Sequence, residues 1–245
     1  GGRTGGPAVL RLRSAAAALR LRGAAAAIRL RSAAALVVAA CGGHAGGAPA
    51  DAPELDAACA LDLLTGGADP IAQGWTVVQQ APATLTYVGD ATRLATSTPP
   101  GAKAGGQLLL ARAAAITAPI ALEVVLQIEQ TAAHNPLDAA VAILGSFTAP
   151  FGTTAERGQM IYLDAGGLGW ADDSARTPAS LIDGADHTVG LALDAAGGAT
   201  VTLDGAVALR RAAYATNGTL AIGDQTNEPG VDAALRIRAV RRRCP

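Results

Sequence analysis

The sequence predicts an all-β protein, an antiparallel sandwich or barrel, on three observations. Apolar and polar residues alternate with period two along runs such as Ile120–Ile128 and Leu235–Val240, which is the pattern of strands with one buried face. The pairs Asp204-Gly205 and Asn217-Gly218 lie beside such runs and supply the positive φ angles of tight hairpins. About a dozen short runs follow at roughly ten-residue spacing, with no clear helix between them.

The elements are expected in a simple order along the chain. Residues 55–64 form either a short helix or the first strand. Long and short strands with one buried face then follow as Ile120–Ile128, Val189–Leu193, Ala199–Leu203, Leu220–Ile222 and Leu235–Val240. No Pro- or Gly-rich linker divides residues 60–245, so we expect a single domain there.

The first part of the chain is repetitive. Residues 10–36 are three near-copies of one unit, LRLRSAAAA, LRLRGAAAA and IRLRSAAAL. Nine residues are half a turn out of phase on a helix, so successive Arg pairs lie on opposite faces and no membrane-binding stripe results. We interpret this segment as low-complexity sequence, disordered or helical.

An export signal follows the last Arg pair. Arg29 and Arg31 precede the uncharged run Ser32–Ala40, which is far shorter than the roughly 20 residues that cross a bilayer. The run ends in Val38-Ala39-Ala40 and then Cys41, and this ending resembles a bacterial lipobox. The resemblance implies that Cys41 is lipidated and anchors an exported protein to the outer membrane or cell surface. The alternative is an ordinary signal peptide beside an incidental Cys41.

These patterns divide the chain into three parts. Residues 1–40 hold the low-complexity segment and the signal peptide. Residues 41–54 are rich in Gly, Ala and Pro and read as a flexible tether. Residues 55–245 form the sandwich domain. The formal net charge of −1 argues against nucleic acid as a partner.

The last sixty residues resemble a known family. The stretch DHTVGLALD at 186–194, the stretch ATVTLDG at 199–205, and the closing runs at 220–224 and 235–240 are similar to laminin-G-like domains of the concanavalin A-like lectin/glucanase superfamily. The resemblance implies a jelly-roll sandwich of two antiparallel sheets with the terminal strands side by side. It thereby implies a disulfide between Cys59 and Cys244, which the oxidising compartment reached by export would permit.

Catalytic chemistry is not evident. Glucanases of this superfamily carry a Glu-x-Asp-x-x-Glu pattern, which this sequence lacks. Glu123 and Glu129 share a strand face, but at about 3.3 Å per residue they lie roughly 20 Å apart, against about 5–9 Å for paired glycosidase carboxylates. We therefore assign no catalytic residue. His187 opens a strand beside Asp186 and is interpreted as a hydrogen-bonded structural histidine.

The most suggestive surface segment is Gly169–Ser174. An exposed Trp170 could stack on a sugar while Asp172 and Asp173 accept hydroxyl protons or bind Ca²⁺. The alternative is that Trp170 packs into the sandwich and the two Asp residues form a solvated turn. No His or Cys cluster has metal-ligand spacing, so no metal or other cofactor is assigned.

The leading hypothesis is a non-catalytic, envelope-anchored sandwich, either a module that binds carbohydrate or protein or a structural surface lipoprotein. The alternative is a glycan hydrolase with an unrecognised active site. A third possibility is an assembly subunit that pairs through open β-edges.

Overall fold

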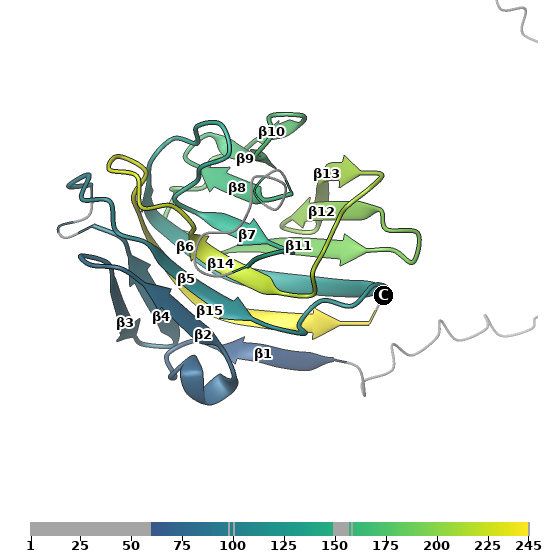
Figure 1. Ribbon diagram of the computed structural model, residues 1–245, viewed down its shortest axis with the longest axis horizontal. Coiled ribbons are helices and arrows are strands. Elements are labelled where there is room, and N and C mark those ends of the chain that lie inside the picture. The colour runs from purple at the N-terminus through teal and green to yellow at the C-terminus, as the bar shows by residue number, and fades with distance from the viewer. Residues whose placement is uncertain (1–59, 98, 100, 149–156, 158, 245) are drawn as a thin grey trace, which may run out of the picture. The chain divides into compact units, whose positions relative to one another are not determined.

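The computed structural model describes residues 60–97, 99, 101–148, 157 and 159–244 (Figure 1). The described strands belong to one compact unit, Asp51–Pro245. The predictions for residues 1–54, including lipidation at Cys41, lie outside the described residues, as does Cys59. Within the described ranges, no helix is long and apolar enough to cross a membrane.

The larger sheet, which we call sheet A, has eight strands (Figure 1). Along the sheet they are β13 (Ala206–Arg211), β12 (Ala199–Leu203), β11 (His187–Leu193), β6 (Ile120–Thr131), β15 (Ala233–Arg243), β4 (Ala91–Ala95) and β3 (Thr84–Val88), with β1 (Leu61–Thr65) also paired to β15. All pairs are antiparallel.

The second sheet, sheet B, has seven strands and is also antiparallel. Its order is β10 (Arg176–Pro178), β9 (Gly167–Trp170), β8 (Ile161–Asp164), β7 (Ala142–Leu144), β14 (Leu220–Asp224), β5 (Leu108–Arg112) and β2 (Thr76–Gln79). The helical content of the described residues is essentially one 3-10 turn, η2 (Ile71–Gln73). The fold is therefore a two-sheet antiparallel sandwich, as predicted, and the barrel alternative is excluded.

The main core lies between the two sheets. Along β6 every second residue from Ile120 to Ile128 is buried, and these side chains pack with Ile143, Leu163 and Ile222 of sheet B. A fully buried Leu or Ile side chain contributes about 1.5–3 kcal/mol relative to an exposed one. Period-two patterning thus correctly predicted which face of β6 is buried.

A second apolar cluster covers the outer face of sheet B. Leu109, Leu144 and Tyr162 point away from sheet A, and the loop residues Phe147 and Met160 pack over them, each at most 3% exposed. Both faces of sheet B are therefore buried over its middle strands.

The terminal strands are neighbours, as the family resemblance implied. Leu61 of β1 lies opposite Arg242 of β15 in an antiparallel ladder, so residues 61–65, left open between helix and strand, are strand. Cys244 follows β15 directly and is disulfide-bonded. Its pairing with Cys59 stays a prediction, because Cys59 lies outside the described residues.

The Asp204-Gly205 turn joins β12 to β13 as the sequence predicted. Asp204 has φ of 49° and Gly205 has φ of 82°, the two positive values that a tight hairpin turn of type I′ requires. The turn places the Asp204 carboxylate beside the start of β11, where its Oδ1 accepts a hydrogen bond from the Thr188 backbone N–H at 2.8 Å.

Candidate functional site

Trp170 is not an exposed stacking platform. It ends β9 and is only 1% exposed. Its ring packs at 5.8 Å from that of Tyr214, and the Arg211 guanidinium lies over it at 4.4 Å. The expectation of an exposed Trp170 is wrong because its side chain points into the core between the two sheets, and the alternative of a packed tryptophan describes the structure.

Asp172 is engaged within the protein rather than free for a ligand. Nη2 of Arg211, from β13, donates to both of its carboxylate oxygens at 2.7 Å, and the Ser174 hydroxyl donates to Oδ1 at 2.6 Å. Burial alone would raise the pKa of Asp172, but the Ser174 hydrogen bonds and the Arg211 charge outweigh it and lower the pKa. The contact ties the β9–β10 turn of sheet B to the edge of sheet A.

Asp173 has a similar internal partner. Its carboxylate lies 3.2 Å from Nε2 of His134, and the His134 ring stacks on Tyr162 with centroids 3.8 Å apart. Asp173 itself sits in the left-handed region at φ of 57° with its side chain 59% exposed. Among the residues that the structure describes, no group of three or more His, Cys, Asp or Glu could hold a metal ion.

The two glutamates of β6 also have basic partners. Oε1 and Oε2 of Glu129 bind Arg236 at 2.5 Å and Arg93 at 2.8 Å. Glu123 binds Nε of Arg243 at 2.9 Å. Each carboxylate is thus ion-paired with one or two guanidinium groups on the outer face of sheet A.

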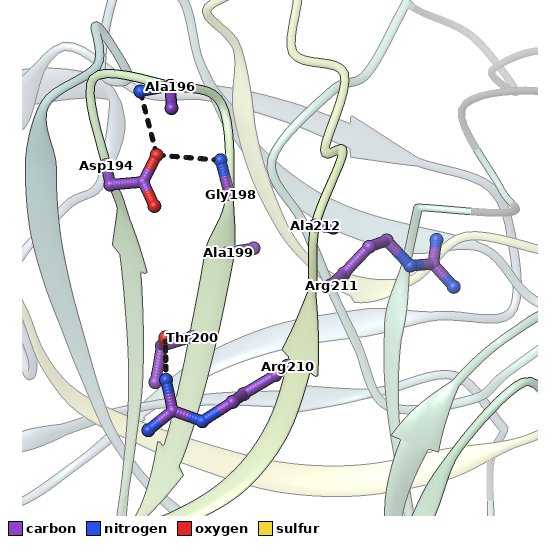
Figure 2. A pocket seen from close by; sticks show the side chains of 8 residues that line it. All are labelled: Asp194, Ala196, Gly198, Ala199, Thr200, Arg210, Arg211 and Ala212. Carbon is purple, nitrogen blue, oxygen red and sulfur yellow. Dashed lines mark hydrogen bonds between the residues drawn. The ribbon is translucent and has the colours of Figure 1, made fainter.

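A hollow opens on sheet A beside the β11–β12 turn (Figure 2). Its volume is about 410 Å³, and its lining includes Asp194, Gly198, Thr200 and Arg210. Oδ1 of Asp194 accepts hydrogen bonds from the backbone N–H groups of Ala196 and Gly198, both at 2.8 Å. These bonds fix the carboxylate at one end of the hollow.

Arg210 closes the other side of the hollow. It lies opposite Thr200 in the β12–β13 ladder, and its Nη1 donates to the Thr200 hydroxyl at 3.2 Å. The next residue, Arg211, points away from Arg210 in Figure 2, toward its partners in sheet B. The side chains of Arg210 and Arg211 therefore lie on opposite faces of sheet A, as the alternation of side chains along a strand requires.

A second hollow of about 160 Å³ continues from Thr200 across β11 and β6. Its floor is made of small residues, among them Gly190, Ala192 and Thr202, and its far side is the Glu123–Arg243 ion pair. We call the two hollows together the sheet A trough, with Asp194, Thr200, Thr202, Arg210, Glu123 and Arg243 as its polar groups.

The trough could not be found from sequence motifs. Its polar groups come from β6, β12, β13 and β15 and from the β11–β12 turn, and only strand pairing brings them together. The one available signal is the outward parity of Thr200 and Thr202 on β12, which the alternation of Ala199, Val201 and Leu203 implies.

His187 is a structural histidine, as expected from the sequence. Its Nδ1 lies 2.9 Å from Asp204 and its Nε2 lies 3.2 Å from Asp183. Its partners are thus not the adjacent Asp186, which binds Arg238 at 2.6 Å. Burial alone would lower the pKa of His187, but the hydrogen bonds and charges of the two aspartates raise it.

Comparison with known proteins gives distant structural likenesses. No protein-family model matches the sequence, and a search of curated proteins finds no significant relative. The similar solved structures include a carbohydrate esterase of the Shiga toxin-encoding bacteriophage phi24B, with 15% identity over 75% of this chain and 98% of that one and a TM-score of 0.49. The Emp46p carbohydrate recognition domain in its potassium-bound form has 13% identity over 78% of this chain and 98% of that one, with a TM-score of 0.47.

A sialidase is a third such structure. It shares 15% identity over 70% of this chain but only 17% of its own length, with a TM-score of 0.49. A shared sandwich architecture at such identities does not carry a function across. The function of this chain has to be argued from its own residues.

Proposed function

We propose that this chain is a non-catalytic, exported β-sandwich that binds a neutral carbohydrate in the sheet A trough. The observation that carries the proposal is the mixture of polar groups there. Asp194 and Glu123 are acceptors, Arg210 and Arg243 are donors, and the hydroxyls of the two threonines between them serve as both.

This mixture fits a polyhydroxylated, uncharged ligand. The two carboxylates and the two guanidinium groups of the trough balance in charge, so an anionic polymer gains no net attraction. A sugar hydroxyl both donates and accepts, and it can satisfy an acidic and a basic neighbour at once. The small floor residues Gly190 and Ala192 let a flat ligand approach the sheet closely.

The absence of catalysis is part of the proposal. Glu123 and Glu129 are held by arginines and lie too far apart for an acid and nucleophile pair. A glycan hydrolase remains the rival function, and release of reducing sugar would favour it. We further propose that a lipid on Cys41 displays the domain at the outer membrane or cell surface.

A glycan array on the purified protein tests the binding function. We expect binding to neutral oligosaccharides, lost in Arg210→Ala and kept in the matched control Arg241→Ala. Arg241 lies on the same sheet but outside the trough, paired with Asp62 at 3.5 Å. Binding should not depend on Ca²⁺. Retention of binding in Arg210→Ala, or binding to proteins alone, would contradict the proposal.

A further inference from the structure

A third hollow, which we call the end hollow, lies where β15 ends and β6 begins. Its volume is about 210 Å³. The segment that joins β5 to β6 forms one side of it, and the last residues of β15 form the other. Its lining includes Thr117, Pro119, Ile120, Arg242, Arg243 and Cys244, and no acidic residue of the described chain belongs to it.

Arg242 occupies an inward-facing position at this end of the sandwich. It lies opposite Leu122 of β6 in the antiparallel ladder, and the Leu122 side chain is buried in the core between the sheets. Residues directly opposite each other in such a ladder share a face. The guanidinium of Arg242 is therefore carried on the side of the strand that elsewhere holds Leu, Ile and Val, and there it lines the end hollow.

The arginines on either side of Arg242 have carboxylate partners, and Arg242 has none. Nε of Arg241 lies 3.5 Å from Asp62, and Nε of Arg243 lies 2.9 Å from Glu123. Within the described part of the chain, the Arg242 guanidinium has neither an ion pair nor a hydrogen bond. Five N–H donors in a planar fork are thus left for a ligand in the end hollow.

Both sides of the end hollow are held in place by the fold. The backbone N–H of Ile116 donates to the Gly218 carbonyl at 3.1 Å, and the Ile116 side chain is 2% exposed, so the segment before β6 is anchored. On the other side, Arg242 is paired with Leu61 of β1, and Cys244 is disulfide-bonded. A preformed site loses less conformational freedom when a ligand binds.

The end hollow is next to the sheet A trough. Arg243 lines both the end hollow and the 160 Å³ hollow of the trough, and Thr200 lines both hollows of the trough. The three hollows follow one another from β13 through β12, β11 and β6 to β15. Four spacings between strands of about 4.8 Å each give a length of about 19 Å, which suits a short oligosaccharide better than a single sugar.

We propose that the end hollow binds the carboxylate of an acidic sugar unit at one end of the oligosaccharide that occupies the trough. This inference rests on the carbohydrate binding proposed above and specifies the ligand as a chain that is neutral along the trough and ends in a uronic acid. The charges of the trough balance, whereas Arg242 adds a positive charge without a counterpart.

The groups of the end hollow match such a unit. The Arg242 guanidinium can hold a carboxylate through two parallel hydrogen bonds, a geometry that an uncharged hydroxymethyl group does not satisfy. The Thr117 hydroxyl can donate to or accept from a ring hydroxyl. Pro119 and Ile120 offer apolar surface to the C–H face of the sugar ring.

Calorimetric titration of the full chain with matched ligand pairs tests the proposal. Each pair consists of two linear tetrasaccharides, of gluco, manno or galacto configuration, which differ only in a CH₂OH or a carboxylate at C6 of one end unit. We expect the acidic member of a pair to bind the wild type about tenfold more tightly than the neutral member. Salt should reduce this gain, because the added contact is between charges.

Two variants separate Arg242 from the general charge of the chain end. Arg242→Gln keeps a polar side chain without the charge and should bind both members of a pair equally. Arg241→Gln removes the same charge from the neighbouring position on the outer face and should keep the preference for the acidic member. The comparison of the two ligands on the wild type needs no variant, so it stands even if a variant fails to fold.

The possible failures can be told apart. If neutral members bind and acidic members bind no more tightly, or if the preference persists in Arg242→Gln, the end hollow is not an acidic subsite although the trough binds carbohydrate. If neither member of any pair binds, the proposed function is itself wrong and this inference is lost with it. If free glucuronate binds as tightly as the acidic tetrasaccharide, the end hollow is an independent carboxylate site, and its place at the end of the chain in the trough is refuted.

Discussion

Replacing His187 tests whether its positive charge holds the β12–β13 turn, through Asp204, and the loop before β11, through Asp183, to the start of β11. The residue is 7% exposed, and its two ring nitrogens lie 2.9 Å from Asp204 and 3.2 Å from Asp183. These hydrogen bonds and charges raise the pKa of His187 above 6.5 in spite of its burial. Folding therefore favours the imidazolium form, which donates to both carboxylates.

The magnitude follows from the better of the two contacts. A hydrogen bond to a charged group contributes about 1.5–3 kcal/mol, and the half-exposed position of Asp204 reduces this to about 1–2 kcal/mol through solvent screening. We assign no energy to the Asp183 contact, because solvent screens that carboxylate. Since the pKa is raised on folding, the contribution is fully present below pH 6.5 and is lost as pH rises through the folded value.

Thermal unfolding of the wild type and His187→Gln from pH 5 to 9 measures this contribution. At about 2–4 °C per kcal/mol for a domain of this size, we expect the variant to melt about 2–8 °C lower at pH 5.5, with the difference shrinking toward pH 9. Asp186→Asn is the matched control, because Asp186 is adjacent in sequence but binds Arg238. A difference between wild type and His187→Gln that stays constant from pH 5 to 9 would refute the reasoning.

Three further predictions concern Arg211 on the edge strand β13, the disulfide expected between the terminal strands, and the lipid anchor. Arg211→Ala should destabilise the protein by about 1–3 kcal/mol, because its guanidinium joins the two sheets. Arg210→Ala should change stability by less than about 0.5 kcal/mol. Urea unfolding measures the free energy of unfolding of both variants. Because β1 and β15 are paired, with Leu61 opposite Arg242, Cys59→Ser and Cys244→Ser should each destabilise by about 2–5 kcal/mol, and peptide mapping should find these two residues linked. Palmitate-analogue labelling in a bacterial host should mark the wild type and not Cys41→Ser. Equal labelling of both proteins would contradict lipidation at Cys41.

The alternation of apolar and polar residues predicted the fold best for strands that have one buried face and one solvent-facing face. Along β6 and β11 the buried positions are those that the sequence indicated, because a half-buried sheet face imposes period two. The Asp204-Gly205 hairpin was equally predictable, because its positive φ angles depend on two adjacent residues. Both signals are local, so they can be recognised in the sequence without knowledge of the tertiary fold.

The same signal fails where both faces of a strand are buried. In β9, Gly167–Trp170, every residue is buried, so nothing in the alternation distinguishes inward from outward. Trp170 beside two aspartates then looked like a surface residue. Its ring lies in the core between the two sheets, beside Tyr214 and under Arg211, which also reaches Asp172 from 39 positions away. Long-range packing of this kind leaves no local trace.

The titrating groups together place the most stable pH of this protein in a mildly acidic range. Asp172 and Asp204 have pKa values lowered by folding, so their contributions are present above pH 3.8 and are lost in stronger acid. His187 and Asp224 have raised pKa values, so their contributions diminish as pH rises. Acid thus removes the contacts around Arg211 and His187, while alkali removes the imidazolium charge of His187. The stability maximum should lie between about pH 4 and 6.5, the unperturbed values of the two residue types.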